Sequence, residues 1–191
     1  MSRVLTPDEY HFPWYVRLFC WNQRRRYGEV LEPTRLWGRT PLVFAALSLL
    51  YGALDRRYSP IEPPLRSLVT VRVSQINWCA FCVDINSALV LKRGIDREKL
   101  ERLGQFRDSS LFTAREKAAL AYCEAMTLSD RQTDDHHFDE LRRYFGQLDA
   151  IIELTAVIAF QNMSSKFNAA LGVEAQGFCR PPAKETRHAE H

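Results

Sequence analysis

The sequence predicts an all-α protein, and three observations lead to that prediction. The 191 residues include only 8 glycines and 9 prolines, and no proline interrupts the later apolar segments. Apolar residues recur at helical spacing through long parts of the chain. One stretch, residues 69–73, is rich in valine and also fits a strand, but Pro63 and Pro64 precede it and suit the first turn of a helix.

Eight helices are expected, and cap and turn residues set their limits. The first spans residues 11–27, carries aromatic and basic side chains and ends near Gly28. The clearest start is at Thr113, which forms a capping box with Glu116. The helix that begins at Leu42 is apolar enough to be buried on most sides. The remaining limits are 42–58, 65–76, 79–93, 96–106, 114–127, 134–145 and 148–171.

Composition and charge narrow the functional class. Hydrophobic residues make up 46% of the chain and charged residues 26%, which is typical of a globular domain and excludes disorder or a fibrous chain. A formal net charge of +3 is too balanced to indicate a nucleic-acid partner. The longest apolar run, Leu42–Leu54, is shorter than the roughly 18 residues of a membrane span. With no targeting segment in residues 1–10, a cytoplasmic protein with no membrane partner is expected.

The strongest local motif is Cys79-Ala-Phe-Cys82 at the start of an expected helix. Two sulfurs on adjacent turns of one face can form a disulfide, and the helix N-terminus favours the reactive thiolate. Half of a zinc site and a pair of inert buried cysteines are alternatives. Tetrahedral zinc needs two further ligands, and the other three cysteines are scattered singly along the chain. These three are expected to be packing residues and not nucleophiles. Those three are Cys20, Cys123 and Cys179.

A weak internal repeat accompanies this motif. Residues 67–75 align with residues 153–161, and residues 82–89 align with residues 164–171. The second alignment pairs Asn86 with Asn168. A true duplication predicts two helix pairs around a pseudo-two-fold axis, of which only one keeps the cysteines.

Residues 67–94, which include Asn77-Trp-Cys-Ala-Phe-Cys82 and Lys-Arg-Gly94, resemble the carboxymuconolactone decarboxylase and AhpD-like alkylhydroperoxidase superfamily. The resemblance covers about residues 40–179. It implies an AhpD-like helical bundle that assembles into homo-oligomers, with residues 1–39 as an N-terminal helical arm and residues 180–191 as a polar tail. It also implies that Cys82 attacks a peroxide and Cys79 resolves the product as a disulfide.

Two departures from the family pattern affect the expected chemistry. The peroxidase members have a glutamate and a histidine where this chain has Ser67 and Asn86. Asn86 lies four residues after Cys82, on the same helix face, but its amide cannot accept a proton as histidine does. It can orient a peroxide or a water. Glu153, aligned with Ser67 in the repeat, is either a substitute base or a first-turn glutamate.

Other charged or titratable residues are expected to be solvent-exposed or structural and not catalytic. Asp84 points away from Cys82 on a helix and is expected to be a solvated or interface charge. Arg72 is expected at the surface, with stabilisation of a thiolate as the alternative. His136 and His137 are expected in a solvated first turn.

The leading hypothesis is a thiol-dependent peroxidase in which Cys82, Cys79 and Asn86 form the catalytic site. It takes a small hydroperoxide as substrate, an external dithiol or protein as reductant, and needs no metal or organic cofactor. The alternatives are a carboxymuconolactone decarboxylase-type enzyme and a non-catalytic, redox-sensing oligomer.

Overall fold

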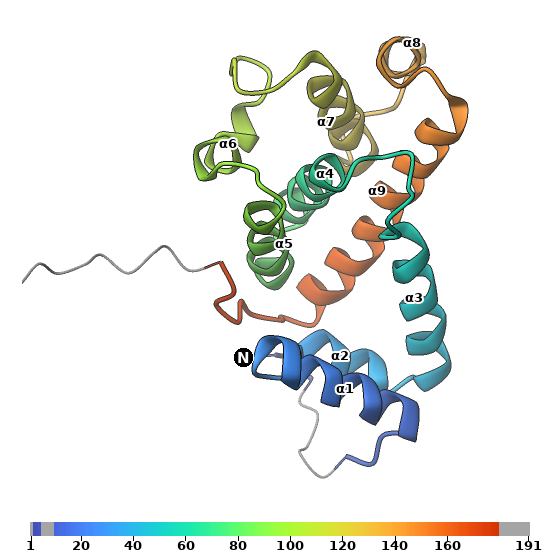
Figure 1. The fold of residues 1–191 in the computed structure, drawn as a ribbon, viewed down its shortest axis with the longest axis vertical. Coiled ribbons are helices and arrows are strands. Elements are labelled where there is room, and N and C mark those ends of the chain that lie inside the picture. Colours follow the sequence, from blue (N-terminus) through green and yellow to red (C-terminus); the bar gives the residue numbers. More distant parts are fainter. Residues whose placement is uncertain (1, 5–9, 180–191) are drawn as a thin grey trace, which may run out of the picture.

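The computed structural model describes residues 2–4 and 10–179, and helices are the only regular secondary structure in those residues (Figure 1). The all-α prediction is therefore confirmed, and the expected tail, residues 180–191, lies outside the described part. The helices are α1 (Trp14–Tyr27), α2 (Glu32–Gly38), α3 (Pro41–Leu54), α4 (Pro63–Ile76), α5 (Ala80–Lys92), α6 (Arg97–Glu101), the 3-10 turn η1 (Leu103–Gln105), α7 (Ala114–Thr127), α8 (Asp135–Phe145) and α9 (Leu148–Ala170).

Helix α4 forms the centre of the bundle. It packs against α5, α7 and α9, and eight of its 14 residues are buried. Val69, Val71 and Val73, which also suit a strand, lie in the main core of this helix bundle and are fully buried. The helix starts at two prolines, whose missing N–H groups need no partner in a first turn. Tertiary packing thus decides in favour of helix where local propensity is ambiguous.

Several boundaries agree with the capping residues of the sequence. Thr113 and Glu116 form the expected capping box, with Thr113 Oγ1 accepting the backbone N–H of Glu116, and α7 has the predicted limits. Gly28 ends α1 at a φ of 84°, a left-handed conformation that favours glycine. Asp134 caps α8 as predicted, and the ring of His137 contacts it at the protein surface.

The structure differs from the expected helices in several places, and the helix expected over residues 42–58 ends at Leu54. The short helix α2 was not predicted, because its seven residues include a proline at the start and no apolar period. The helix predicted over residues 96–106 divides into α6 and η1. A further difference is the repeat: α4 and α5 form one pair, but residues 153–170 lie within the single helix α9. Trp78, at a φ of 54°, separates α4 from α5, and α9 has no such interruption.

Helix α3 is much less buried than its composition predicts. It ends at Leu54, and Phe44 is its one buried residue, whereas Leu42 and Leu49 are 85% and 77% exposed. The physical reason is its position. It contacts α2 and α9 along one side and faces outward along the other (Figure 1). In the described part of the chain, no helix is long and apolar enough to span a membrane.

Helices α1 and α2 lie side by side at one end of the molecule, and α3 links them to the bundle (Figure 1). A small apolar cluster of Val16, Cys20, Val30 and Phe44 joins α1 to α3, and Trp37 of α2 packs against it. Gln23 Nε2 on α1 also donates a buried hydrogen bond of 2.8 Å to Thr34 Oγ1 on α2.

Asp84 on α5 anchors the segment that follows α9. Its carboxylate accepts four backbone N–H groups at 2.6–3.0 Å, so the expectation of a solvated or interface charge is wrong. The donors belong to Gln176, Gly177, Phe178 and Cys179. In turn, Gln176 Oε1 accepts the backbone N–H of Glu32 at 2.9 Å, which ties α2 to the same segment.

A buried glutamate connects α4 to α7. Glu124 is 2% exposed, and its carboxylate pairs with Arg72 at 2.5 Å, Arg107 at 2.6 Å and Arg131 at 3.1 Å. Arg72 is therefore neither a surface residue nor a partner of the cysteines. Burial alone would raise the pKa of Glu124, but the hydrogen bonds and charges of Arg72 and Arg107 outweigh burial and hold the pKa below its usual value.

Glu124→Gln should lower the free energy of unfolding at pH 7 by about 3 kcal/mol, because it leaves a buried cluster of arginines without its carboxylate. The folded-state pKa lies below the unfolded one, so the stabilisation is present above pH ~4.3 and is lost as the pH falls through the folded value. Urea titrations of both proteins between pH 7 and pH 3 measure this. Glu98→Gln, at an exposed site, is the control. If the free energies of unfolding of the unmodified protein and Glu124→Gln differ by the same amount at every pH, the proposed role of the Glu124 carboxylate is wrong.

Candidate active site

The two motif cysteines lie at the junction between α4 and α5. Cys79 is the N-cap of α5, and its Sγ accepts the backbone N–H of Cys82 at 3.2 Å. The two sulfurs form a disulfide, with the Cα atoms 5.2 Å apart. Because Cys82 lies in the first turn of α5, the positive end of the helix dipole favours a negative charge on its sulfur once the bond is reduced.

Hydrogen bonds from α4 and α9 fix this junction. The backbone N–H of Cys79 donates to Ser74 O at 3.1 Å. Asn77 Nδ2 donates to Asn162 Oδ1 and to Ser165 Oγ on α9, each at 2.9 Å. The dithiol is consequently held in place by the two helices that form the centre of the bundle.

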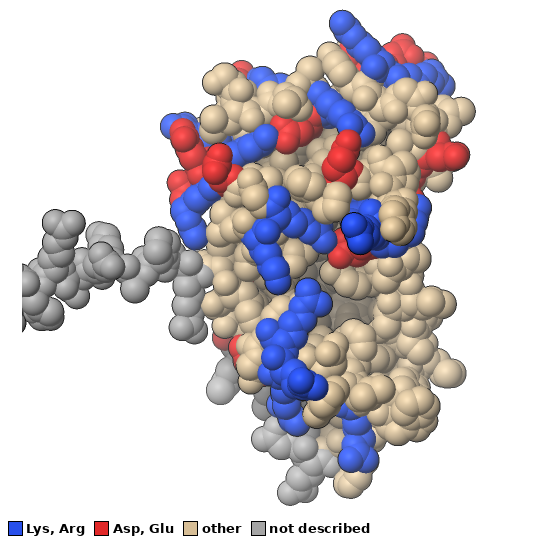
Figure 2. Space-filling model, in the orientation of Figure 1, with Lys and Arg blue, Asp and Glu red and all other residues tan. Residues whose placement is uncertain are grey.

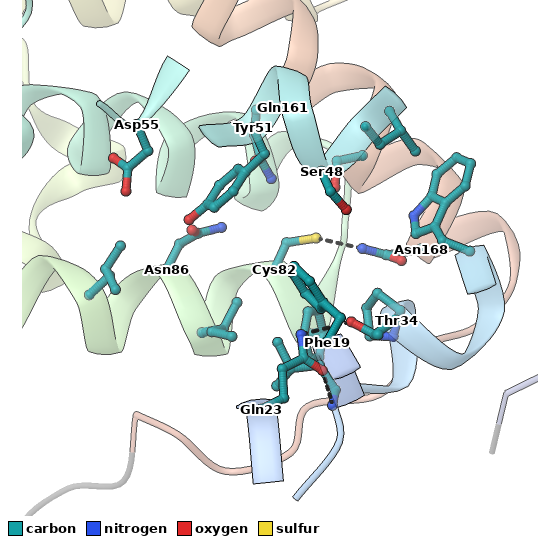
Figure 3. A pocket seen from close by; sticks show the side chains of 18 of the residues that line it. Phe19, Gln23, Thr34, Ser48, Tyr51, Asp55, Cys82, Asn86, Gln161 and Asn168 are labelled. Atoms are coloured by element: carbon teal, nitrogen blue, oxygen red, sulfur yellow. Dashed lines mark hydrogen bonds between the residues drawn. The ribbon is translucent and has the colours of Figure 1, made fainter. Parts of the chain in front are cut away.

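A cavity of about 330 Å³ opens beside Cys82, between α1, α2 and α3 on one side and α5 and α9 on the other (Figure 3). This volume lies at the lower end of the range of small-molecule sites. Figure 2 shows a hollow on this face, and it shows few acidic side chains over the half that contains α1–α3. About half of the apolar residues in the wall are aromatic, among them Phe19, Tyr27, Trp37, Phe44, Phe81 and Phe160.

The two sulfurs differ in their access to this cavity. Cys82 is 3% exposed and is one of the lining residues, whereas Cys79 is fully buried and does not line the cavity. A molecule in the cavity therefore meets Cys82 first, and Cys79 lies directly behind it.

Two asparagines line the cavity close to Cys82. Asn86 lies one turn further along α5, as its spacing predicts, and makes no hydrogen bond to Cys82 (Figure 3). Asn168 comes from α9, and its Nδ2 donates to Cys82 Sγ at 3.2 Å. Asn168 was not predicted as a site residue, although its alignment with Asn86 in the weak internal repeat is a signal that pairs the two positions.

Ser67, at the position where the peroxidase members have a glutamate, has a structural role in this protein. Ser67 is buried, and its Oγ accepts a hydrogen bond of 2.7 Å from Arg93. Arg93 also donates to both carboxylate oxygens of Asp55, at 2.8 and 2.9 Å. Asp55 and Arg93 line the cavity, so an ion pair forms part of its wall. In Figure 3, Asp55 lies beyond Tyr51 and Asn86 as seen from Cys82.

Tyr51 provides an O–H group on the same side of the cavity. Its hydroxyl points toward Asn86 in Figure 3. Desolvation of the hydroxyl, followed by the charge of the nearby Asp55 carboxylate, raises the pKa of Tyr51 above its ordinary value, although the residue as a whole is 51% exposed. The protonated hydroxyl can donate a hydrogen bond to a molecule in the cavity.

Glu153 is not brought to the dithiol. It pairs with Arg56 at 2.5 Å and with the hydroxyl of Ser59, and it does not line the cavity of Cys82. Glu153 is thus a structural carboxylate that holds the segment after α3. It does not act as a substitute base in this arrangement.

The remaining cysteines lie apart from the pair. Cys20 and Cys123 are buried, and burial raises the pKa of both thiols, that of Cys123 to about 12. They are poor nucleophiles at neutral pH, as their expected packing role implies. Cys179 is partly exposed. Within the described residues, no three His, Cys, Asp or Glu side chains converge in a way that would hold a metal ion.

Comparisons with known proteins show the family and the fold of the chain. The model of the carboxymuconolactone decarboxylase family matches residues 41–125. The uncharacterized protein YnjA of Escherichia coli (strain K12) is 42% identical over 174 residues, which are 91% of this chain and 95% of that protein.

Two solved structures share the fold. The alkylhydroperoxidase AhpD core protein from Ralstonia eutropha JMP134, described as peroxidase-related, has a TM-score of 0.82 at 18% identity, over 93% of this chain and 94% of that one. The debrominase Bmp8 has a TM-score of 0.75 at 24% identity, over 86% and 88% of the two chains. With its dithiol at a helix start and its AhpD-like helical fold, the chain belongs to the carboxymuconolactone decarboxylase family.

Proposed function

We propose that the protein is a thiol-dependent peroxidase that reduces organic hydroperoxides through Cys82 and Cys79. The observation that carries this proposal is the unequal access of the two sulfurs: Cys82 lines the cavity, and Cys79 is buried behind it. This order suits an attacking and a resolving thiol. The aromatic wall favours an organic hydroperoxide over hydrogen peroxide, because a small polar molecule gains little from apolar contacts.

The reaction proceeds in three balanced steps. The Cys82 thiolate attacks the terminal oxygen of the hydroperoxide, an S–O bond forms, the O–O bond breaks, and the alkoxide leaves and takes a proton. The Cys79 thiol then attacks the sulfenic acid of Cys82, and water leaves as the disulfide forms. An external dithiol or protein reductant, itself oxidised to a disulfide, returns both cysteines to thiols. No metal or organic cofactor takes part in these steps.

The proton for the alkoxide does not come from the glutamate and histidine of the peroxidase members, because this chain has Ser67 and Asn86 at those positions. Ser67 is engaged with Arg93, and Asn86 cannot act as an acid or base. Tyr51 lines the same cavity, its phenol is far more acidic than an alcohol, and we assign to it the transfer of a proton to the alkoxide. The site of action is the cytoplasm, where external dithiols are available.

Cys82→Ser should abolish hydroperoxide consumption, because it removes the attacking sulfur. Cys79→Ser should consume one equivalent of hydroperoxide per chain and stop at the sulfenic acid, because no disulfide can follow. Stopped-flow measurement with cumene hydroperoxide and pre-reduced protein freed of dithiol distinguishes the two, because excess dithiothreitol would reduce the sulfenic acid directly. Cys123→Ser is the matched control. Retention of hydroperoxide consumption by Cys82→Ser would refute the role of Cys82. Turnover of a carboxylated lactone that survives loss of both cysteines would favour a decarboxylase-type enzyme, whereas reactivity with hydroperoxide no greater than that of free cysteine would favour a redox sensor.

Asn86→His should raise the second-order rate constant for hydroperoxide by about tenfold near pH 7. It places an imidazole one turn from Cys82, and an acid–base group typically contributes 10²–10⁴-fold, less here because the glutamate that orients the family histidine is absent. The same stopped-flow assay measures the effect. Asn86→Gln, which retains an amide, should not gain activity. A rate for Asn86→His at or below that of the unmodified protein would contradict this prediction.

We also propose that the chain forms a homo-oligomer through α3. Its exposed face contains large apolar side chains, including Leu42 and Leu49, that no part of the described chain covers. Such a surface is typical of an interface. A second copy placed against α3 would also close the cavity wall to which Tyr51 belongs.

Leu49→Asp should weaken self-association by at least about tenfold, because a carboxylate buried in an apolar interface loses its hydration without gaining a partner. Light scattering coupled to size-exclusion chromatography measures the mass at several concentrations. Leu148→Asp replaces a leucine of similar exposure, 64%, at the start of α9 and should leave the mass unchanged. If the chain is a monomer before substitution, the interface proposal fails.

A further inference from the structure

We infer that Asn168 is a positioning residue that holds Cys82 as a thiolate in the reduced protein. This inference rests on the proposed role of Cys82 as the attacking thiol. Asn168 Nδ2 donates to Cys82 Sγ at 3.2 Å. A disulfide sulfur is a weak acceptor, whereas a thiolate is a strong one, so the bond gains strength when the disulfide is reduced. Hydrogen bonding to the charged form of a group lowers its pKa.

The amide of Asn168 is buried, and the sulfur of Cys82 is its one polar partner among the described residues. Its side chain is 1% exposed, and its Oδ1 is buried without any hydrogen-bond partner. An unsatisfied buried carbonyl costs free energy that an apolar residue at this position would avoid. The bond to the sulfur is the single hydrogen bond of this side chain in the described part of the protein.

The backbone around Asn168 is fixed in a way that suits this role. Its carbonyl accepts the N–H of Val173 at 3.0 Å, and Val173 packs in the same buried cluster as Cys79 and Cys82. Asn168 therefore approaches Cys82 from α9, while the N-terminus of α5 approaches from its own helix. The Asn168 amide and the N-terminus of α5 both stabilise a negative charge on the Cys82 sulfur. Ser67 and Asn86 supply no base at this site.

The test is the pH dependence of Cys82 alkylation in a Cys79→Ser background, in which no disulfide can form. Iodoacetamide is the probe, and mass spectrometry of the Cys82 peptide separates its reaction from that of the other cysteines. Asn168→Ala should raise the midpoint by about one pH unit, which lowers the alkylation rate about tenfold below both midpoints. Asn168→Asp, of nearly identical shape, should raise it further, because a carboxylate repels the thiolate.

Ser164→Ala is the matched control, because Ser164 lines the same wall one turn earlier on α9 and makes no hydrogen bond to Cys82. Its midpoint should equal that of the background protein. A midpoint unchanged in Asn168→Ala, or one in Asn168→Asp that is not raised, overturns the inference. If Asn168→Ala does not fold, the result for Asn168→Asp decides. The midpoint does not depend on turnover, so this inference and the peroxidase proposal fail separately.

Discussion

The enclosure of α4 by α5, α7 and α9 is the constraint on which the geometry of the site depends. The last turn of α4 carries Ser74, whose carbonyl holds the N–H of Cys79 and whose hydroxyl accepts Gln161 Nε2 at 2.9 Å. Asn77 ties the following turn to α9. The Arg72–Glu124 pair fixes the far side of α4 to α7. The dithiol therefore cannot shift without a rearrangement of the core.

The cavity combines this rigid centre with a more open periphery. Helices α5 and α9 present Cys82, Asn86 and Asn168, whereas α1, α2 and α3 supply most of the aromatic wall. The stacking of Trp37 on Phe167, with ring centroids 3.5 Å apart, joins the two parts. The dithiol and most of the aromatic wall thus come from different regions of the fold.

Features that depend on neighbours in sequence were predictable, and those that depend on distant contacts were not. The capping box at Thr113 and the dithiol at a helix start follow from spacing alone. Asn168 lies 86 residues from Cys82, and the backbone donors to Asp84 lie more than 90 residues away, so no local pattern reveals either contact. The apolar composition of a helix such as α3 also does not predict whether its own chain or a second copy of the chain covers it.

The central claim is that Cys82, facing the cavity, is oxidised before Cys79. The direct measurement exposes reduced protein to one equivalent of cumene hydroperoxide in the presence of dimedone, which traps sulfenic acids, and locates the adduct by peptide mass spectrometry. The Cys79→Ser protein should carry the adduct on Cys82, and the Cys82→Ser protein should carry none on Cys79. An adduct on Cys79, or none on Cys82, would contradict the account.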